Sequence, residues 1–513
     1  MEYWKLFMYI PIFTALYVFT SHFLRRIQNL PPSPLLSLPI IGHLYLLKKP
    51  LHRTFSTISQ RFGPIFFLQC GSRPVVVVSS PSAVEECLTK NDIVFANRPR
   101  KMIVGKILAY NYTMLSWSPY GHHWRNLRRI SSLHIFSSHR LQLLSGIRHE
   151  EVKSLILKLS VEKEWRIVDA KVALGELMLN IVMRMIAGKR YYGDKLEDLE
   201  EAKRFKEIQA ESLRQTGKSY VGDFLPFMSW IGVGKGLEKS MIELQGKRDE
   251  FIQNLIDQHR RKMEDSNSEE KNKTLIEVLL SLQQTESEFF KDEIIRGLVL
   301  VLLLGGTETS ASTMEWALSL LLNHQDVLKK VQEEIDNHVG FDRLIDESDL
   351  TQLPYLQCII NETLRMYPAA PLLLPHESSQ DCTVSGYRIP RGTTLFINLW
   401  AIQNDLANWA EPSSFKPERF MGLGGTRDGF RLMPFGSGRR SCPGESLALR
   451  VIGLALGSLI QCCEWERPSE EMIDMTGEMR VSMPRARHLQ AKCRPRPIML
   501  NTLSHIGSTS NVA

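Results

Sequence analysis

The chain has 513 residues, of which 43% are hydrophobic, so it is long enough to bury a large core. Its formal net charge is +7, and the basic residues are spread along the sequence without interleaved aromatic residues, which argues against nucleic-acid binding. A mildly basic protein of this kind suits an acidic protein partner or an anionic membrane surface. The eight cysteines show no paired framework and no CxxC spacing, which argues against a disulfide scaffold or a zinc site and indicates a reducing compartment.

The N-terminal segment predicts a membrane anchor. Residues 6–24 form a mostly apolar run without a formal charge, roughly long enough to cross a bilayer as a helix. A cleaved signal peptide is the alternative, but no small-x-small cleavage site follows the run. Arg25 and Arg26 follow it, against a single Lys5 before it, so the positive-inside rule places the rest of the chain in the cytoplasm. We expect residues 1–26 to be an anchor with its basic flank.

A connector and a β-rich section follow the anchor. Residues 27–50 are dense in proline, which excludes a helix and predicts a stiff extended hinge. Residues 65–70 and 75–78 are predicted strands, bounded by glycine, proline and serine. The sequence is then mostly helical, so we predict a mainly α fold with a small β-rich lobe. Residues 498–513 are polar and small at their end, which predicts a disordered tail.

Near the C-terminus, a glycine-rich loop presents Cys442 directly before a predicted helix. Pro443 suits the first helical position, where no backbone N–H is needed. A sulfur at a helix N-terminus, beside Arg439 and Arg440, is expected to lie in a positive field that favours the thiolate. Glycines let the loop turn tightly and let a flat, bulky group lie against it. A thiolate is one of the known axial ligands of haem iron, whereas the simpler alternative is a buried cysteine in a turn.

The full pattern, Phe435-x-x-Gly438-x-Arg440-x-Cys442-x-Gly444, resembles the haem-binding loop of the cytochrome P-450 family. The resemblance implies haem b as cofactor, with Cys442 as the axial thiolate ligand of the iron. It also implies that Phe435, Gly438 and Arg440 belong to the haem site, and that electrons come from NADPH through a flavin reductase.

The same resemblance identifies residues that would reach the haem propionates. Trp124 and Arg128 are four residues apart and share one face of a predicted helix, which alone indicates only an amphipathic helix with a solvated basic side. In the family, a Trp-x-x-x-Arg pair at this point contacts a propionate. His376 would ordinarily be a surface or packing histidine, but it stands where plant members carry a His or Arg that reaches a propionate.

An apolar run, residues 294–304, leads into Gly305-Gly306-Thr307-Glu308-Thr309 before helical sequence resumes. Glycine inside a helix costs on the order of 1 kcal/mol relative to alanine, so we expect either close helix packing or a locally widened turn. The segment resembles the oxygen-activation motif of the family. On that resemblance Thr309 would hydrogen-bond the iron-bound peroxo group, and Glu308 would help relay protons from solvent.

Other segments have structural or pocket roles under this resemblance. Glu362, Arg365 and Arg419 match the buried Glu–Arg–Arg triad of the family and are expected to hold the fold rather than to catalyse. Residues 369–374 and 477–481 are expected to line the substrate pocket. Three further expectations concern the surface and the catalytic domain: residues 224–231 form either a core turn or a channel-roof loop that touches lipid, residues 259–273 form a solvated loop, and residues 51–497 form the haem-thiolate catalytic domain.

The whole chain is identified as a member of the plant microsomal cytochrome P-450 family, and residues 375–379 and 488–496 are most similar to the isoflavone 2'-hydroxylase-like group. This implies a monooxygenase that inserts one oxygen atom from O2 into a lipophilic plant specialised metabolite, an isoflavonoid, another phenolic or a terpenoid. Hydroxylation is the usual outcome, and a methylenedioxy bridge is another. The implied partners are NADPH–cytochrome P-450 reductase and membrane lipid, in a single-pass endoplasmic reticulum protein with a cytoplasmic catalytic domain.

Two other classes of function remain open from the sequence. A haem-thiolate isomerase or dehydratase would need neither reductase nor oxygen, so NADPH dependence of turnover separates it from a monooxygenase. A membrane-anchored binding protein could keep the fold without chemistry, and absence of haem after purification would support it.

Overall fold

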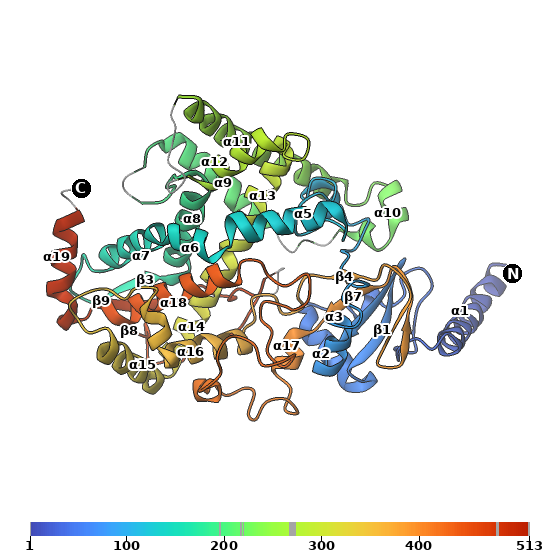
Figure 1. Cartoon of the computed structure of the whole chain (residues 1–513). Coiled ribbons are helices and arrows are strands. Elements are labelled where there is room, and N and C mark those ends of the chain that lie inside the picture. Colours follow the sequence, from blue (N-terminus) through green and yellow to red (C-terminus); the bar gives the residue numbers. More distant parts are fainter. Residues whose placement is uncertain are drawn as a thin grey trace.

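The computed structural model describes residues 2–193, 196–215, 218, 220–265, 273–478 and 482–510. Figure 1 shows a large helical body and a smaller β-rich lobe. Helix α1 (Glu2–Ile27) extends from the lobe, and helix α19 (Leu500–Ser510) lies at the opposite end of the molecule. The prediction of a mainly α fold with a small β-rich part is confirmed.

The lobe is built on a four-stranded sheet with the order β1-β2-β7-β4. The predicted strands are present as β1 (Ile65–Cys70) and β2 (Arg73–Val78), which pair antiparallel, while β2 and β7 (Thr394–Ile397) run parallel. Alternate residues of β1 and β2 enter two separate apolar clusters, because successive side chains of a strand point to opposite faces. Residues 65–68 and 75–78 are therefore hydrophobic at every position. The other elements of the lobe are α2 (Leu51–Phe62), α3 (Pro81–Leu88), β4 (His376–Glu377), β5 (Cys382–Val384), β6 (Tyr387–Ile389) and α17 (Leu399–Gln403).

The helical body surrounds a central helix, α14 (Glu308–Asn323), whose residues 310–322 are all buried. It packs against α8 (Ala170–Ala187), α16 (Pro354–Met366) and α18 (Glu445–Cys462). The remaining helices are α4 (Ile103–Ile107), α5 (His122–Ile130), α6 (Ser138–Leu143), α7 (Ser145–Leu159), α9 (Leu199–Gln215), α10 (Pro226–Trp230), α11 (Lys235–Asp265), α12 (Leu275–Thr285), α13 (Asp292–Gly306) and α15 (Gln325–His338). A three-stranded sheet of β3 (Arg166–Asp169), β9 (Gln490–Pro495) and β8 (Cys463–Glu466) borders this body.

Two helical segments of the described chain are long and apolar enough to cross a membrane, Asp292–Asn323 and Glu445–Cys462. More than half of the most apolar window of each is buried inside the fold, 56% and 72% respectively. Both are therefore core helices of the body. Helix α1 differs from them, because its large apolar side chains are exposed; they include Tyr9, Ile12, Phe13, Leu16, Phe19 and Phe23.

The hinge segment lies against the lobe and is anchored by side chains. Arg25, in the last turn of α1, donates hydrogen bonds to the hydroxyl groups of Ser33 and Ser37 at 3.3 and 2.9 Å. The buried His43 ring connects the carbonyl of Pro34 to the N–H of Gln69 on β1. The segment between α1 and α2 is therefore fixed to the sheet, and the boundaries of residues 27–50 as a separate hinge remain a prediction.

The structure corrects two expectations about loops. Residues 500–510 form α19 rather than a disordered tail, because Leu503 on this helix and Met499 directly before it are both buried. The remaining residues, 511–513, lie outside the described part. The expected loop at 259–273 begins as helix, since α11 continues to Asp265, and residues 266–272 also lie outside the described part.

Candidate functional site

The loop before α18 holds Cys442 in a tight backbone turn. The N–H of Cys442 donates to the carbonyl of Phe435 at 2.8 Å, and Gly436 and Gly438 both have φ of +68°, a conformation that favours glycine. A Cβ on Gly438 would also lie 2.5 Å from Oδ1 of Asp92. Gly438 is thus required by the packing of the loop on the segment that follows α3.

Cys442 is the one exposed cysteine among the eight. Crowding by the surrounding protein nevertheless raises the pKa of its thiol, and the N–H of Gly444 and the guanidinium groups of Arg128 and Arg427 only partly oppose this. In the protein alone the sulfur is therefore a thiol that solvent can reach. Thiolate character at this position requires a metal ion at the sulfur.

The expectation that Arg439 and Arg440 create a positive field at the sulfur is wrong, because neither side chain turns toward the sulfur. Arg439 forms an ion pair with Asp92, Nε to Oδ2 at 3.1 Å. Arg440 points inward, and its guanidinium carbon lies 4.4 Å from the ring centroid of Trp124. Sequence adjacency predicted proximity to Cys442, but the turn at Gly438 directs both arginines away.

Three arginines, Arg98, Arg128 and Arg440, converge beside the cysteine loop. They are held by main-chain carbonyls rather than by carboxylates, and no ion pair joins them to an acidic residue of the described chain. Their main acceptors are the carbonyls of Ser116, Leu374 and Pro375 for Arg98, of Ser441 for Arg128, and of Ala96, Leu115 and Ser118 for Arg440.

This arginine cluster carries uncompensated positive charge. Burial, followed by repulsion from Arg98 and Arg128, lowers the pKa of Arg440 to about 8. Burial lowers the pKa of Arg98 to about 10. A buried charge without a partner is costly, so such a cluster favours a bound anion.

Two predicted residues complete the cluster. Trp124 is buried, and its ring lies against the guanidinium group of Arg440. The buried His376 ring lies 2.7 Å from the carbonyl of Phe95 through Nδ1, and burial together with Arg98 lowers its pKa to about 3. The predicted pair Trp124 and Arg128 thus lies at one site with His376 and Arg440, which come from other segments of the chain. Arg98 was missed, since nothing in its neighbouring sequence distinguishes it from other basic residues.

The central helix is interrupted at the glycines, which agrees with the widened turn, one of the two alternatives expected from the sequence. Helix α13 ends at Gly306 and α14 begins at Glu308, with Thr307 between them at φ −101° and ψ −74°. The hydroxyl of Thr309 donates to the carbonyl of Gly305 at 2.8 Å. A Cβ on Gly305 would meet no atom within 4 Å, so close helix packing does not explain this glycine.

Open space lies beside this break. Leu304 is 38% exposed although the helix is otherwise largely buried, and Gly305 is exposed as well. The Oε1 atom of Glu308 is buried without a hydrogen-bond partner. The break therefore combines an open apolar face, a hydroxyl group and an unpaired carboxylate oxygen.

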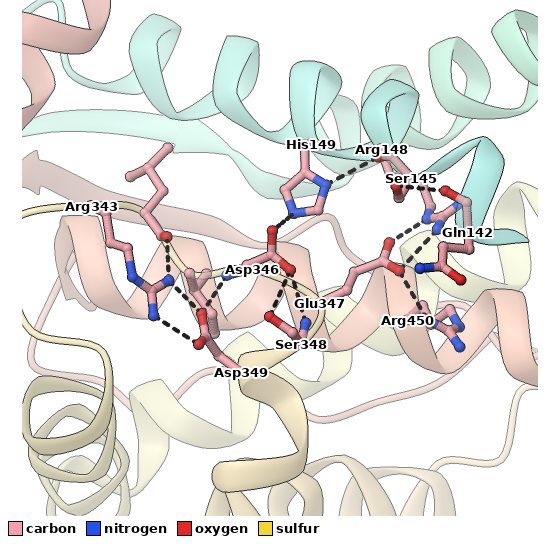
Figure 2. A network of polar contacts seen from close by, with 12 residues as sticks. Gln142, Ser145, Arg148, His149, Arg343, Asp346, Glu347, Ser348, Asp349 and Arg450 are labelled. Atoms are coloured by element: carbon pink, nitrogen blue, oxygen red, sulfur yellow. Dashed lines mark hydrogen bonds and ion pairs between the residues drawn. The ribbon is translucent and has the colours of Figure 1, made fainter.

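Helix α18, which begins three residues after Cys442, is fixed by a polar network (Figure 2). Glu347 accepts hydrogen bonds from the fully buried Arg148 on α7 and, at 3.1 Å, from Arg450 on α18. Beside it, Nε2 of His149 lies 3.1 Å from Oδ2 of Asp346. The network joins α7, the loop before α16 and α18, and so holds the helix that follows the thiol.

The Glu–Arg–Arg triad has the predicted geometry. Glu362 accepts from Arg365 at 2.7 and 2.9 Å and from Arg419 at 3.0 Å, and the side chains of Glu362 and Arg365 are fully buried. The remaining N–H groups of Arg365 donate to the carbonyls of Gln403 and Pro412. Every charge is paired inside the fold, which indicates a structural rather than a catalytic role.

The two segments expected to line a pocket are only partly described. Leu372 is buried, and the carbonyl of Leu374 accepts from Arg98. Residues 479–481 lie outside the described chain. Gly477, at the start of the same segment, packs on Trp316, whose ring would lie 3.6 Å from a Cβ built on Gly477.

These residues fit a flat, dianionic cofactor with a metal at its centre. The exposed thiol supplies a metal ligand, the arginine cluster supplies charge for two carboxylates, and the open face of α13 leaves room beside the break. Haem b has these properties, and cysteine thiolate is one of its known axial ligands. The fold and site thus define a haem-thiolate protein.

Comparisons with known proteins agree with the assignment to the haem-thiolate proteins. The family model for Cytochrome P-450 matches residues 31–489, and the chain belongs to this family. It is 51% identical to Cytochrome P-450 81Q32 of Catharanthus roseus, covering 94% of each chain. It is 47% identical to (+)-piperitol/(+)-sesamin synthase of Sesamum radiatum (94% and 93% covered), and 46% identical to an isoflavone 2'-hydroxylase of Glycyrrhiza echinata (93% and 94%).

A solved structure shows the same fold. A zebrafish cytochrome P-450 determined with progesterone superimposes with a TM-score of 0.76 at 26% identity, covering 87% of this chain and 100% of that one. The chain is therefore a haem-dependent monooxygenase of the plant type, supplied with electrons by a reductase. The isomerase and binding-protein alternatives are not supported by these relatives.

Proposed function

We propose that this chain is a membrane-anchored plant monooxygenase that oxidises a phenolic specialised metabolite of the isoflavonoid or lignan type. The observation that carries the site assignment is the arginine cluster without acidic partners next to the one exposed cysteine. The substrate class rests on the relatives, since curated proteins at 46–47% identity are an isoflavone 2'-hydroxylase and (+)-piperitol/(+)-sesamin synthase.

In this proposal each residue has a defined task toward haem. Cys442 binds the iron through Sγ, while Arg98, Arg128 and Arg440 pair with the two propionates. Trp124 and His376 would contact the same carboxylates. Phe435 and Gly438 shape the loop. When bound, thiolate-ligated haem reduces O2 with two electrons and two protons, placing one oxygen atom in the substrate and releasing the other as water.

The helix break would deliver protons to the reaction and exclude unproductive orientations of the substrate. The hydroxyl of Thr309 can turn from the carbonyl of Gly305 toward the open space. Glu308, the residue directly before Thr309, is our candidate to carry a proton, through its unpaired Oε1. Leu304 offers an apolar surface for a flat aromatic substrate. A substrate hydroxyl beside a methoxy group would allow closure of a methylenedioxy ring instead of hydroxylation.

We infer an endoplasmic reticulum location with α1 as the single membrane span. The exposed apolar side chains of α1 support it, and so does a second apolar surface at α10. There Trp230 and Ile231 are 84% and 71% exposed, and α10 and α1 extend toward the same side of the molecule in Figure 1. This favours the lipid-contacting alternative for residues 224–231. The exposed Arg125 and Arg129 on α5, near the cysteine loop, suit docking of an acidic reductase surface.

The test is turnover in microsomes that contain the full chain and NADPH–cytochrome P-450 reductase. We expect oxidised product from an isoflavone or from (+)-piperitol only when NADPH and O2 are both present. Product formed without NADPH would contradict the proposal, and so would NADPH-dependent oxidation restricted to terpenoids.

A further inference from the structure

Residues 99–115 form a strap whose two ends lie at the arginine cluster. Arg98 stands directly before it and donates to the carbonyl of Ser116 at 3.1 Å, while Arg440 donates to the carbonyl of Leu115 at 3.3 Å. The middle of the strap leaves the cluster and reaches α11 and α13. It therefore spans the space between the cofactor site and the helix that carries the break.

The middle of the strap adopts an unfavourable backbone. Tyr110, Asn111 and Tyr112 have φ of +49°, +50° and +64°, so three successive residues with side chains occupy the left-handed region. Such conformations persist only where the surrounding structure enforces them. The surrounding contacts therefore hold this turn in a conformation that its own residues disfavour.

One side chain ties this turn to the neighbouring helices. The hydroxyl of Tyr110 donates to Oδ1 of Asp249 on α11 at 2.5 Å. Gln245 on the same helix also hydrogen-bonds the Tyr110 side chain, so among the described residues Tyr110 makes the polar side-chain contacts between residues 103–112 and α11. Asp249 is itself oriented, since it accepts from Gln245 at 2.9 Å and lies 3.9 Å from Arg296.

The ring of Tyr110 lies on the face of α13 that also carries Leu304. A Cβ built on Gly297 would be 3.7 Å from the Tyr110 ring. Gly297 and Leu304 are seven residues apart, which places them on the same helical face about 10 Å from each other. Tyr110 therefore packs on the buried part of the helical face whose other end is the exposed Leu304 beside the break.

We propose that the hydrogen bond from Tyr110 to Asp249 is a latch that holds the strap over the substrate space and limits the entry of bulky ligands. Tyr110 is then a specificity-determining residue that acts through ligand size. Small ligands pass without opening the strap, whereas a polycyclic ligand enters only when the latch breaks. This inference rests on the proposed function, because it places the substrate beside α13.

The test compares two tyrosines of the same turn in the full-length haem protein. Tyr110→Phe removes only the latch hydroxyl. Tyr112→Phe is the matched control, because the Tyr112 hydroxyl bonds the carbonyl of Met102 within the strap at 2.8 Å. Stopped-flow absorbance follows the association of imidazole, a small iron ligand, and of clotrimazole, a bulky one.

We expect Tyr110→Phe to raise the association rate of clotrimazole by about tenfold, since a hydrogen bond to a carboxylate is lost, and that of imidazole less than twofold. Tyr112→Phe should change neither rate. Equal rates in haem-loaded wild type and Tyr110→Phe, or the same acceleration for both azoles, would overturn the latch. A wild-type protein that shows no azole-induced spectral shift would instead contradict the haem site itself.

Discussion

Arg128 on α5 donates a hydrogen bond of 2.8 Å to the carbonyl of Ser441, the residue directly before Cys442. One guanidinium group therefore both supports the loop that presents the thiol and contributes charge to the arginine cluster. Burial lowers the pKa of Arg128, while proximity to Cys442 raises it. The position of the thiol and the binding of an anionic cofactor thus depend on the same side chain.

Replacing Arg128 should reduce the amount of haem that the protein binds. We expect Arg128→Ala to retain several-fold less haem per protein, because it removes a propionate partner and the support of Ser441 at once. Arg129→Ala, at the exposed neighbouring position, should keep its haem. The ratio of Soret to protein absorbance after purification measures this. Equal haem contents in the two variants would remove Arg128 from the site.

Thr309→Ala should uncouple NADPH oxidation from product formation. The substitution removes the hydroxyl at the helix break without touching the cysteine loop, so we expect normal haem content and about tenfold less product per NADPH oxidised. Thr313→Ala is the control, since that hydroxyl bonds the carbonyl of Thr309 one turn further along α14. Product, NADPH and hydrogen peroxide are measured together. An unchanged ratio in Thr309→Ala would exclude its proposed task.

Arg419→Ala should destabilise the whole fold. It removes one hydrogen bond to the fully buried Glu362, which stays paired with Arg365, and losing a hydrogen bond to a charged group costs roughly 1.5–3 kcal/mol. Arg388→Ala breaks an exposed pair with Asp381 and should change stability little. Urea denaturation of the haem protein, followed by tryptophan fluorescence, compares them. Similar midpoints would show that the triad does not hold the fold.

His43 should make the attachment of the hinge depend on pH. Burial lowers its pKa to about 4, below the ordinary value of 6.5, so the folded protein holds a neutral ring that accepts the N–H of Gln69. Between these values the unfolded chain takes up a proton that the folded chain does not, so stability falls as the pH drops from 6.5 to 4, by about 1.4 kcal/mol per pH unit.

The variant His43→Gln removes this titration. All other groups titrate as in the wild type, so the difference in the pH dependence of the free energy of unfolding isolates His43. We expect a shallower loss of stability in the variant between pH 6.5 and 5. Identical pH dependence in both proteins would show that His43 does not titrate in this way.

The sequence was most informative where a rare residue type occurs in a fixed pattern. The family resemblance identified the loop around Cys442 and the Glu362–Arg365–Arg419 triad, and the structure brings the three triad residues together. The glycines before Thr307 mark a helix break, which agrees with one of the two alternatives that the sequence left open. The first two strands of the lobe were also predicted, because strands buried on both faces give short apolar runs bounded by turn residues.

Features that depend on tertiary contacts were missed. Arg98 joins the cluster only because the fold brings it to residues 374–375, far away in the sequence. Arg439 follows Gly438 in the chain, but a left-handed turn directs it to Asp92 instead of the sulfur. Residues 500–510 were misjudged because two buried apolar residues suffice to dock a short polar helix.

The central claim is that Cys442 binds haem iron as a thiolate. The most direct test is the reduced carbon-monoxide difference spectrum of microsomes that contain this chain, with Cys442→Ser as the paired sample. We predict a Soret band at the position of thiolate-ligated haem in the wild type and its loss in the variant. A wild-type band at the position of histidine-ligated haem, or an unchanged band in Cys442→Ser, would contradict the assignment.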